Sequence, residues 1–200
     1  CIFNMKSNIW LKRRLKDTYI KKAKSQGYVS RSAFKLIQIE NKYKLIVKSR
    51  NILELGSSPG GWSQVICELN KQSKIDAFDL LAMKYKNENI NFYRQDFFQY
   101  IFKSFNKKYD LILSDMAPNT TGHQSTDHLK ITSIIQDVIF ILGDISSPKS
   151  NFVFKIWKGS EEKNIIYQLK KQYKKVSYFK PRSSRDESSE IFIVAENFIV

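Results

Sequence analysis

The sequence predicts an α/β fold with a seven-stranded, mainly parallel sheet whose last strand is antiparallel. Three observations support this prediction. Seven apolar, β-rich runs recur along the 200 residues, and segments long enough for a helix separate most of them. A glycine-rich turn follows the first run, as in open sheets that bind ligands at the carboxyl ends of their strands. The last two runs are joined only by the polar stretch from Pro181 to Ser189, which is too short for an ordinary crossover helix.

Each predicted strand is a short apolar run, which is typical of strands that are buried on both faces. The runs are Asn51 to Leu55, Ile75 to Leu81, Asn91 to Gln95, Tyr109 to Asp115, Asn151 to Trp157, Val176 to Lys180 and Ile191 to Val200. Because helical segments alternate with these runs, we expect helices on both faces of the sheet.

Two helices are predicted ahead of the first strand. In the first, Leu11, Leu15, Tyr19 and Ala23 repeat every four residues in an amphipathic pattern, which Gly27 interrupts.

The second predicted helix runs from Ala33 to about Tyr43 and carries Lys35. The segment Ser30 to Ser32 offers hydroxyl groups for its N-cap, and Phe34 and Ile37 are expected to face inward.

The composition indicates one soluble domain. A hydrophobic content of 42% and an aromatic content of 14% exclude a disordered chain, and no apolar stretch approaches the roughly 18 residues of a membrane span. Two cysteines without a CxxC pair and two histidines give neither a disulfide framework nor a zinc site, which favours a reducing compartment. We therefore expect a monomeric single domain over residues 1–200, with a basic helical extension at about 1–45 and no membrane association.

Most of the net charge of +15 lies near the N-terminus. Residues 1–50 hold 14 Lys and Arg against Asp17 and Glu40, whereas residues 51–200 hold 20 against 17 acids. A local basic surplus favours a nucleic-acid partner, and the alternative is a solvated charge run. Residues 1–16 contain no acid, as in a transit peptide, and the start at Cys1 suggests residues upstream. The amphipathic repeat favours a structural, RNA-facing helix over a cleaved leader.

Residues 54–62, Glu-Leu-Gly-Ser-Ser-Pro-Gly-Gly-Trp, connect the first strand to a segment with a helical pattern. Glycines let the backbone approach a ligand closely and adopt positive φ at little cost, so Gly56 and Gly60 predict a nucleotide-sized cradle. Pro59 and Gly61 depart from the dinucleotide pattern G-x-G-x-x-G, which disfavours NAD. The turn suits a ligand with adenosine hydroxyls and an amine but no phosphate, such as S-adenosylmethionine. The alternative is a tight turn that only packs.

Charged residues lie near the carboxyl ends of the predicted strands, where ligands of open α/β sheets bind. Asp79 lies near the end of the second strand, Asp96 ends the third, Asp115 ends the fourth and Lys155 falls late in the fifth. A carboxylate at Asp79 can accept from both ribose hydroxyls, and one at Asp96 can accept from an adenine amine. Each carboxylate can instead cap a helix or solvate a loop.

Lys155 lies in an otherwise apolar run, and a buried lysine is rare unless it is paired. Asp115 on the neighbouring strand is the natural counter-charge, and Glu190 is a possible second one. A lysine amine within reach of a hydroxyl can act as a general base. The alternative is a buried ion pair that specifies the fold.

Taken together, these residues resemble those of the FtsJ/RrmJ ribose 2'-O-methyltransferases, from about Trp10 to Asn197. The motifs that carry the resemblance are ELGSSPGGWSQ from Glu54, LSDMAPN from Leu113 and KPRSSR from Lys180. The resemblance implies the class I, Rossmann-like S-adenosylmethionine-dependent methyltransferase fold with a reversed last strand.

The resemblance also implies roles for individual residues. The family's catalytic tetrad falls on Lys35, Asp115, Lys155 and Glu190, with Lys155 helping to remove the hydroxyl proton. Its residues for S-adenosylmethionine fall on Gly56, Gly60, Trp62, Asp79, Asp96 and Asp115, and the chemistry requires no metal.

Within the family, the motif around Asp115 and the SRSAFKL segment that contains Lys35 are similar to the bacterial and mitochondrial ribosomal branch. This likeness implies a uridine of large-subunit ribosomal RNA as substrate, ribosomal RNA or the large subunit as partner, and a mitochondrial or other organellar location.

Three alternatives remain at this stage: an inactive RNA-binding ribosome-assembly factor, a transfer-RNA 2'-O-methyltransferase and a nicotinamide oxidoreductase. Neither His123 nor His128 enters the predicted mechanism, and each is expected to be exposed or to pack.

Overall fold

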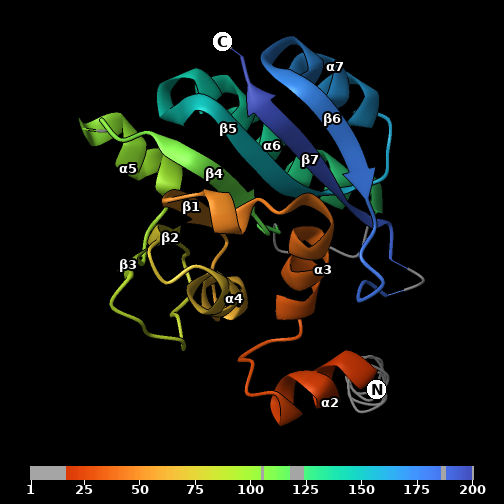
Figure 1. Ribbon diagram of the computed structural model, residues 1–200. Coiled ribbons are helices and arrows are strands. Elements are labelled where there is room, and N and C mark those ends of the chain that lie inside the picture. Colours follow the sequence, from red (N-terminus) through yellow and green to blue (C-terminus); the bar gives the residue numbers. More distant parts are fainter. Residues whose placement is uncertain (1–16, 105, 118–123, 186–187, 200) are drawn as a thin grey trace.

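The computed structural model describes residues 17–104, 106–117, 124–185 and 188–199. One sheet of seven strands, in the order β3-β2-β1-β4-β5-β7-β6, forms the centre of the molecule (Figure 1). The strands are β1 (Asn51–Leu55), β2 (Lys74–Phe78), β3 (Ile90–Tyr93), β4 (Tyr109–Ser114), β5 (Ser146–Trp157), β6 (Tyr173–Phe179) and β7 (Glu190–Phe198). All seven predicted strands are present.

The strand directions confirm the predicted topology. Strands β1 to β5 pair in parallel, with β1 between β2 and β4. Strand β7 lies between β5 and β6 and is antiparallel to both. The short polar connection before β7 therefore turns the chain back, as its length predicts.

Helices cover both faces of the sheet, as expected for a parallel sheet. Helices α3 and α4 pack on one face, and α5, α6 and α7 pack on the other. Neighbouring residues of β5 point to opposite faces of the sheet. Val153 packs in the core cluster formed with α3 and α4, and Phe154 packs in the cluster formed with α5, α6 and α7. The helices are α2 (Thr18–Ser25), α3 (Ala33–Tyr43), η1 (Ile46–Lys48), α4 (Gly61–Leu69), α5 (Phe97–Ser104), α6 (Gln124–Ile145) and α7 (Glu162–Gln172).

Strand boundaries differ from the prediction in every strand except β1. Strand β2 ends at Phe78 instead of Leu81, and β6 begins at Tyr173 instead of Val176. Strand β5 begins at Ser146 instead of Asn151, because its first residues, Ser-Ser-Pro-Lys-Ser, carry no apolar pattern. Strand β3 ends at Tyr93, so Asp96 does not end that strand. Asp96 lies instead just before α5, where its Oδ1 accepts a hydrogen bond of 2.8 Å from the Phe98 N–H.

The N-terminal helices differ from the prediction in their caps. Ser32 has helical dihedrals and makes no capping hydrogen bond, so the predicted N-cap of α3 is wrong, although its bounds are correct. The Asp17 carboxylate caps α2 by accepting from Tyr19 and Ile20 N–H groups. Leu11 and Leu15 of the predicted first helix lie outside the described residues, whereas Ala23 is buried as expected.

No helix within the described ranges is long and apolar enough to cross a membrane.

Candidate active site

The glycine turn between β1 and α4 has the predicted strand, turn and helix arrangement. Gly56 has a φ of +76° and Gly60 a φ of +107°, which are costly for residues with a side chain. A Cβ on Gly56 would lie 2.8 Å from the Met116 backbone nitrogen, and one on Gly60 would lie 2.7 Å from Tyr85 Cβ. Both positions therefore require glycine, and Gly56 brings the turn directly against the end of β4.

Trp62 is buried and does not present its ring to a ligand. Its side chain is 2% exposed, its Nε1 donates to the Ser32 carbonyl at 2.9 Å, and its ring packs on Phe192. The predicted cofactor role of Trp62 is thus restricted to its backbone, in the first turn of α4, where N–H groups lack helical partners.

The two carboxylates predicted to hold adenosine also support their own loops. Asp79, the first residue after β2, accepts from the Ser58 and Leu81 N–H groups, each at 2.8 Å. Asp96 caps α5. Since each carboxylate oxygen has two lone pairs, these bonds leave acceptor capacity for a ligand.

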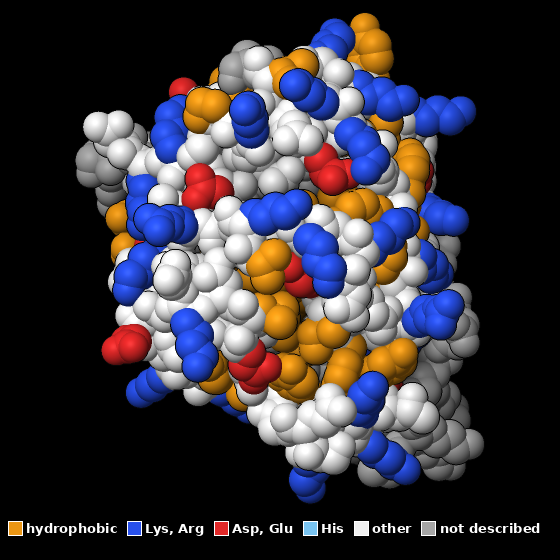
Figure 2. Space-filling model, viewed as in Figure 1, with side chains coloured by type: hydrophobic (Ala, Val, Ile, Leu, Met, Phe, Trp, Pro, Cys, Tyr) orange, Lys and Arg blue, Asp and Glu red, His pale blue; other side chains and the backbone are white. Residues whose placement is uncertain are grey.

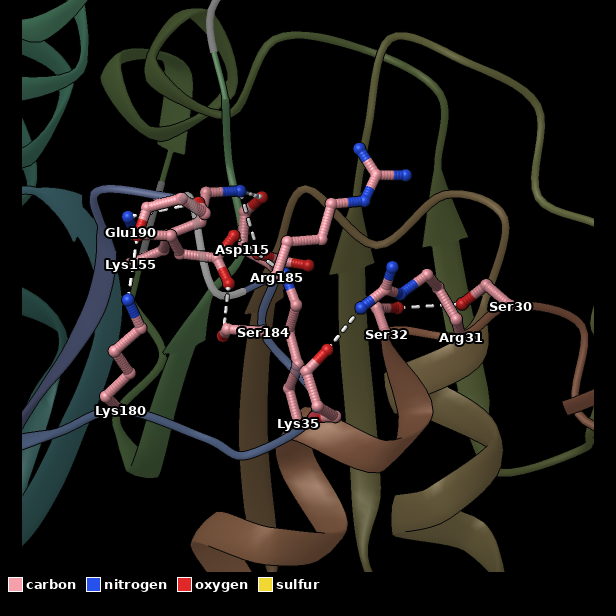
Figure 3. A network of polar contacts seen from close by, with 12 residues as sticks. Ser30, Arg31, Ser32, Lys35, Asp115, Lys155, Lys180, Ser184, Arg185 and Glu190 are labelled. Atoms are coloured by element: carbon pink, nitrogen blue, oxygen red, sulfur yellow. Dashed lines mark hydrogen bonds and ion pairs between the residues drawn. The ribbon is translucent and has the colours of Figure 1, made fainter. Parts of the chain in front are cut away.

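Figure 3 shows the four predicted catalytic residues converging from α3, the end of β4, β5 and the start of β7. The Lys155 Nζ donates to the Asp115 Oδ1 at 2.8 Å and to the Asp115 carbonyl at 2.6 Å. Lys155 is only 6% exposed, so the predicted pairing of a buried lysine with Asp115 is confirmed.

Glu190 has different partners from those suggested by the sequence. Its Oε2 accepts from the Lys35 Nζ at 2.7 Å and its Oε1 accepts from the Ser184 hydroxyl at 2.8 Å. Among the described residues, the ion pairs join Lys155 to Asp115 and Glu190 to Lys35, so the expectation that Glu190 is a second counter-charge of Lys155 is wrong. The site contains two neighbouring ion pairs, Lys155 with Asp115 and Lys35 with Glu190.

The electrostatics connect these pairs. Burial raises the pKa of Asp115, but the Lys155 and Lys35 charges and the Lys155 hydrogen bond outweigh burial, so the net pKa lies below its ordinary range. Asp115 is therefore a carboxylate at neutral pH. It orients the Lys155 amine by two hydrogen bonds.

Glu54 is a buried acid to which sequence reasoning gave no role. Burial, the largest effect, raises its pKa to about 8, and the charges of Asp115 and Asp79 act in the same direction. The Ser63 hydroxyl donates to Glu54 and opposes this shift. The signal in the sequence was a carboxylate inside the apolar run Asn-Ile-Leu-Glu-Leu.

The segment before β7 is also tied to the N-terminal helices. Arg31 pairs with Asp17 and donates to the Ser183 carbonyl, and Arg185 lies 3.6 Å from the Asp17 carboxylate. These contacts place Arg31 and Arg185 beside the tetrad (Figure 3). The sequence indicated a basic N-terminal region but not this long-range connection.

Of the two histidines, the structure describes His128, which lies on α6. The His128 ring packs against Gly159 and its Nδ1 contacts the Trp157 carbonyl, which confirms a packing role. His123 lies outside the described residues.

Comparisons with known proteins agree with this geometry. The model of the FtsJ-like methyltransferase family matches residues 28–198. The chain is 38% identical over 202 residues to Ribosomal RNA large subunit methyltransferase E of Rickettsia africae, covering 96% of this chain and 88% of the relative. It is 39% identical to the protein of the same name from Rickettsia akari, with the same coverage.

A solved structure is similar as well. The crystal structure of a ribosomal RNA methyltransferase from Plasmodium falciparum superposes with a TM-score of 0.72 at 30% identity. The match covers 86% of this chain and 98% of that one.

Proposed function

Because the chain belongs to the FtsJ-like methyltransferase family and is a methyltransferase, we propose that it methylates a ribose 2'-hydroxyl of large-subunit ribosomal RNA, at a uridine. The methyl donor in this proposal is S-adenosylmethionine. The substrate class is supported by the names of its relatives, and the cation-rich surface in Figure 2 suits a polyanion. Monomeric state and an organellar location stay predictions.

The residues around the glycine turn fit S-adenosylmethionine. Gly56 and Gly60 leave the turn without side chains, and Asp79, Asp96 and Asp115 supply acceptors for hydroxyl and amine groups. The backbone of Trp62 supplies donors at the start of α4. When bound, this cofactor supplies an electrophilic methyl group.

The observation that carries the proposal is the fixed amine of Lys155 at the carboxyl end of the sheet. In the neutral form of this amine, the two hydrogen bonds to Asp115 use both N–H groups. The lone pair is then left to accept the 2'-hydroxyl proton. General-base help of this kind contributes about 10² to 10⁴ in rate.

Lys35 and Glu190 support this chemistry from the adjacent ion pair. Lys35 adds positive charge beside Asp115, which keeps that carboxylate ionised. The Lys35 side chain is 13% exposed, so its ammonium group can also contact the phosphate or sugar of the target nucleotide. Glu190 and Ser184 hold Lys35 in place.

The proposal is tested by methyl transfer from labelled S-adenosylmethionine to ribosomal RNA. A 2'-O-methyl group removes the hydroxyl that alkaline cleavage requires, so the label should be recovered in alkali-resistant dinucleotides that begin with uridine. Label on a base, or transfer to transfer RNA but not to ribosomal RNA, would contradict the proposed substrate.

A further inference from the structure

The end of the sheet opposite the reaction centre, where the parallel strands β4 and β5 begin, contains a cavity of about 300 Å³. It is lined by the C-terminal end of α3, the η1 turn, the beginnings of β4 and β5, and the end of β7. Its charged residues are Lys44, Lys48, Lys149, Asp110 and Glu196. None of these belongs to the site described above.

The lining acids are already bound, whereas the lysines are not. The Asp110 carboxylate accepts from the Arg50 and Asn51 N–H groups, both at 2.9 Å. Glu196 pairs with Lys175 at 2.6 Å. Within the part of the chain that the structure describes, Lys44, Lys48 and Lys149 have no carboxylate partner, so the cavity offers three cations to an incoming anion.

Residues with a strained, left-handed backbone line the same cavity. Of the residues described, the non-glycine residues with positive φ are Lys44 (55°), Lys149 (63°) and Asn197 (62°). All three line this cavity. Left-handed backbone is costly for residues with a side chain and tends to cluster at ligand sites.

Helix α3 connects this cavity to the reaction centre. Its first turn carries Lys35, which belongs to the tetrad, and its C-cap is Lys44. Eleven residues of α-helix span about 16 Å, a distance that a few nucleotides of RNA backbone can follow. Lys42, exposed near the end of the helix, adds a further cation along this path.

We propose that this cavity is a second RNA site, which holds a backbone phosphate of the ribosomal RNA while the target nucleotide lies beside Lys155. The inference rests on the proposed function, because it assumes that the substrate is RNA. Lysines act here as point charges for phosphate oxygens. They add affinity and register without reading sequence.

The test compares RNA binding by the wild-type protein and by a variant with Lys44→Asn, Lys48→Gln and Lys149→Asn. Asparagine tolerates positive φ, so the backbone at Lys44 and Lys149 should be preserved. The matched control removes three exposed charges from α7 through Lys163→Gln, Lys170→Gln and Lys171→Gln. Binding of each protein to the same ribosomal RNA is measured between 50 and 200 mM salt, and S-adenosylhomocysteine binding is measured by calorimetry.

The loss of one phosphate contact should lower the slope of log affinity against log salt by about 0.7 to 0.9. Over this fourfold salt range, the wild-type protein should lose about 3-fold more affinity than the cavity variant. The control should keep the wild-type slope, and all three proteins should bind S-adenosylhomocysteine equally. Methylation by the cavity variant should show a raised KM for RNA with an unchanged kcat.

Equal slopes for the wild-type protein and the cavity variant would overturn the inference, as would an equal decrease in the control. If inorganic phosphate shifts the amide signals of Lys44 and Lys149 but ribosomal RNA does not, the cavity binds a small free anion and the RNA assignment is wrong. A wild-type protein that does not bind ribosomal RNA at all would contradict the proposed function itself, so the two failures are distinguishable.

Discussion

Replacing Gly56 with alanine tests how closely the glycine turn approaches the reaction centre. A left-handed backbone costs a residue with a Cβ about 1–2 kcal/mol, and Gly56 has a φ of +76°. The new Cβ would also lie 2.8 Å from the Met116 nitrogen and 3.1 Å from the Asp115 carbonyl carbon. These are backbone atoms that cannot rotate away, so an overpacking cost of about 1–3 kcal/mol adds to the dihedral cost.

Gly27 provides a matched control, because its φ is also +76° but nothing lies within 4 Å of its Cβ position. Urea denaturation should show a loss of about 1–2 kcal/mol for Gly27→Ala and about 2–5 kcal/mol for Gly56→Ala. Only Gly56→Ala should also lower methyl transfer, since its Cβ displaces the backbone of Asp115. Equal stability losses together with normal methyl transfer by both variants would refute this reasoning.

Two further predictions concern buried charges. Asp115→Asn should lower the free energy of unfolding by about 3–5 kcal/mol because it leaves Lys155 buried beside a neutral partner, and adding Lys155→Met should recover much of this loss. The corresponding double-mutant cycle at the exposed Lys175–Glu196 pair should show a far weaker coupling energy. Similar coupling energies at both pairs would contradict the account. Glu54 has a pKa of about 8 in the folded protein against 4.5 when free, so folding takes up a proton at pH values between 4.5 and 8. The contribution of Glu54 to the free energy of unfolding is complete below pH 4.5. It should be lost as the pH rises towards 8, by at most about 1.4 kcal/mol per pH unit. Glu54→Gln should flatten this dependence in urea denaturation at pH 5 to 8, and an unchanged slope would show that Glu54 is not protonated in the folded state.

The strands and the tetrad could be predicted from sequence because each has a local signal. An apolar run reveals a buried strand, and Lys155 within such a run requires a counter-charge on a neighbouring strand. The turn at Gly56 was readable for the same reason, since glycine and proline mark positions with special dihedrals.

What the sequence did not reveal depends on long-range packing. Glu190 bonds to Lys35, 155 positions away, and Arg31 donates to Ser183, 152 positions away, and no local pattern specifies such pairs. The buried ring of Trp62 likewise follows from how α3 packs on α4. The sequence predicts Asp96 at a strand end because the run Asn91 to Gln95 directly precedes it, whereas β3 ends at Tyr93.

The central claim, that the Lys155 amine accepts the proton from the ribose hydroxyl, is tested most directly by single-turnover methyl transfer with Lys155→Met and, as a control, Lys170→Met on the exposed face of α7. Both variants should bind S-adenosylhomocysteine and ribosomal RNA like the wild-type protein. The account predicts that Lys155→Met alone slows the chemical step by about 10² to 10⁴. A Lys155→Met protein that binds both ligands and transfers methyl groups at the wild-type rate would contradict it.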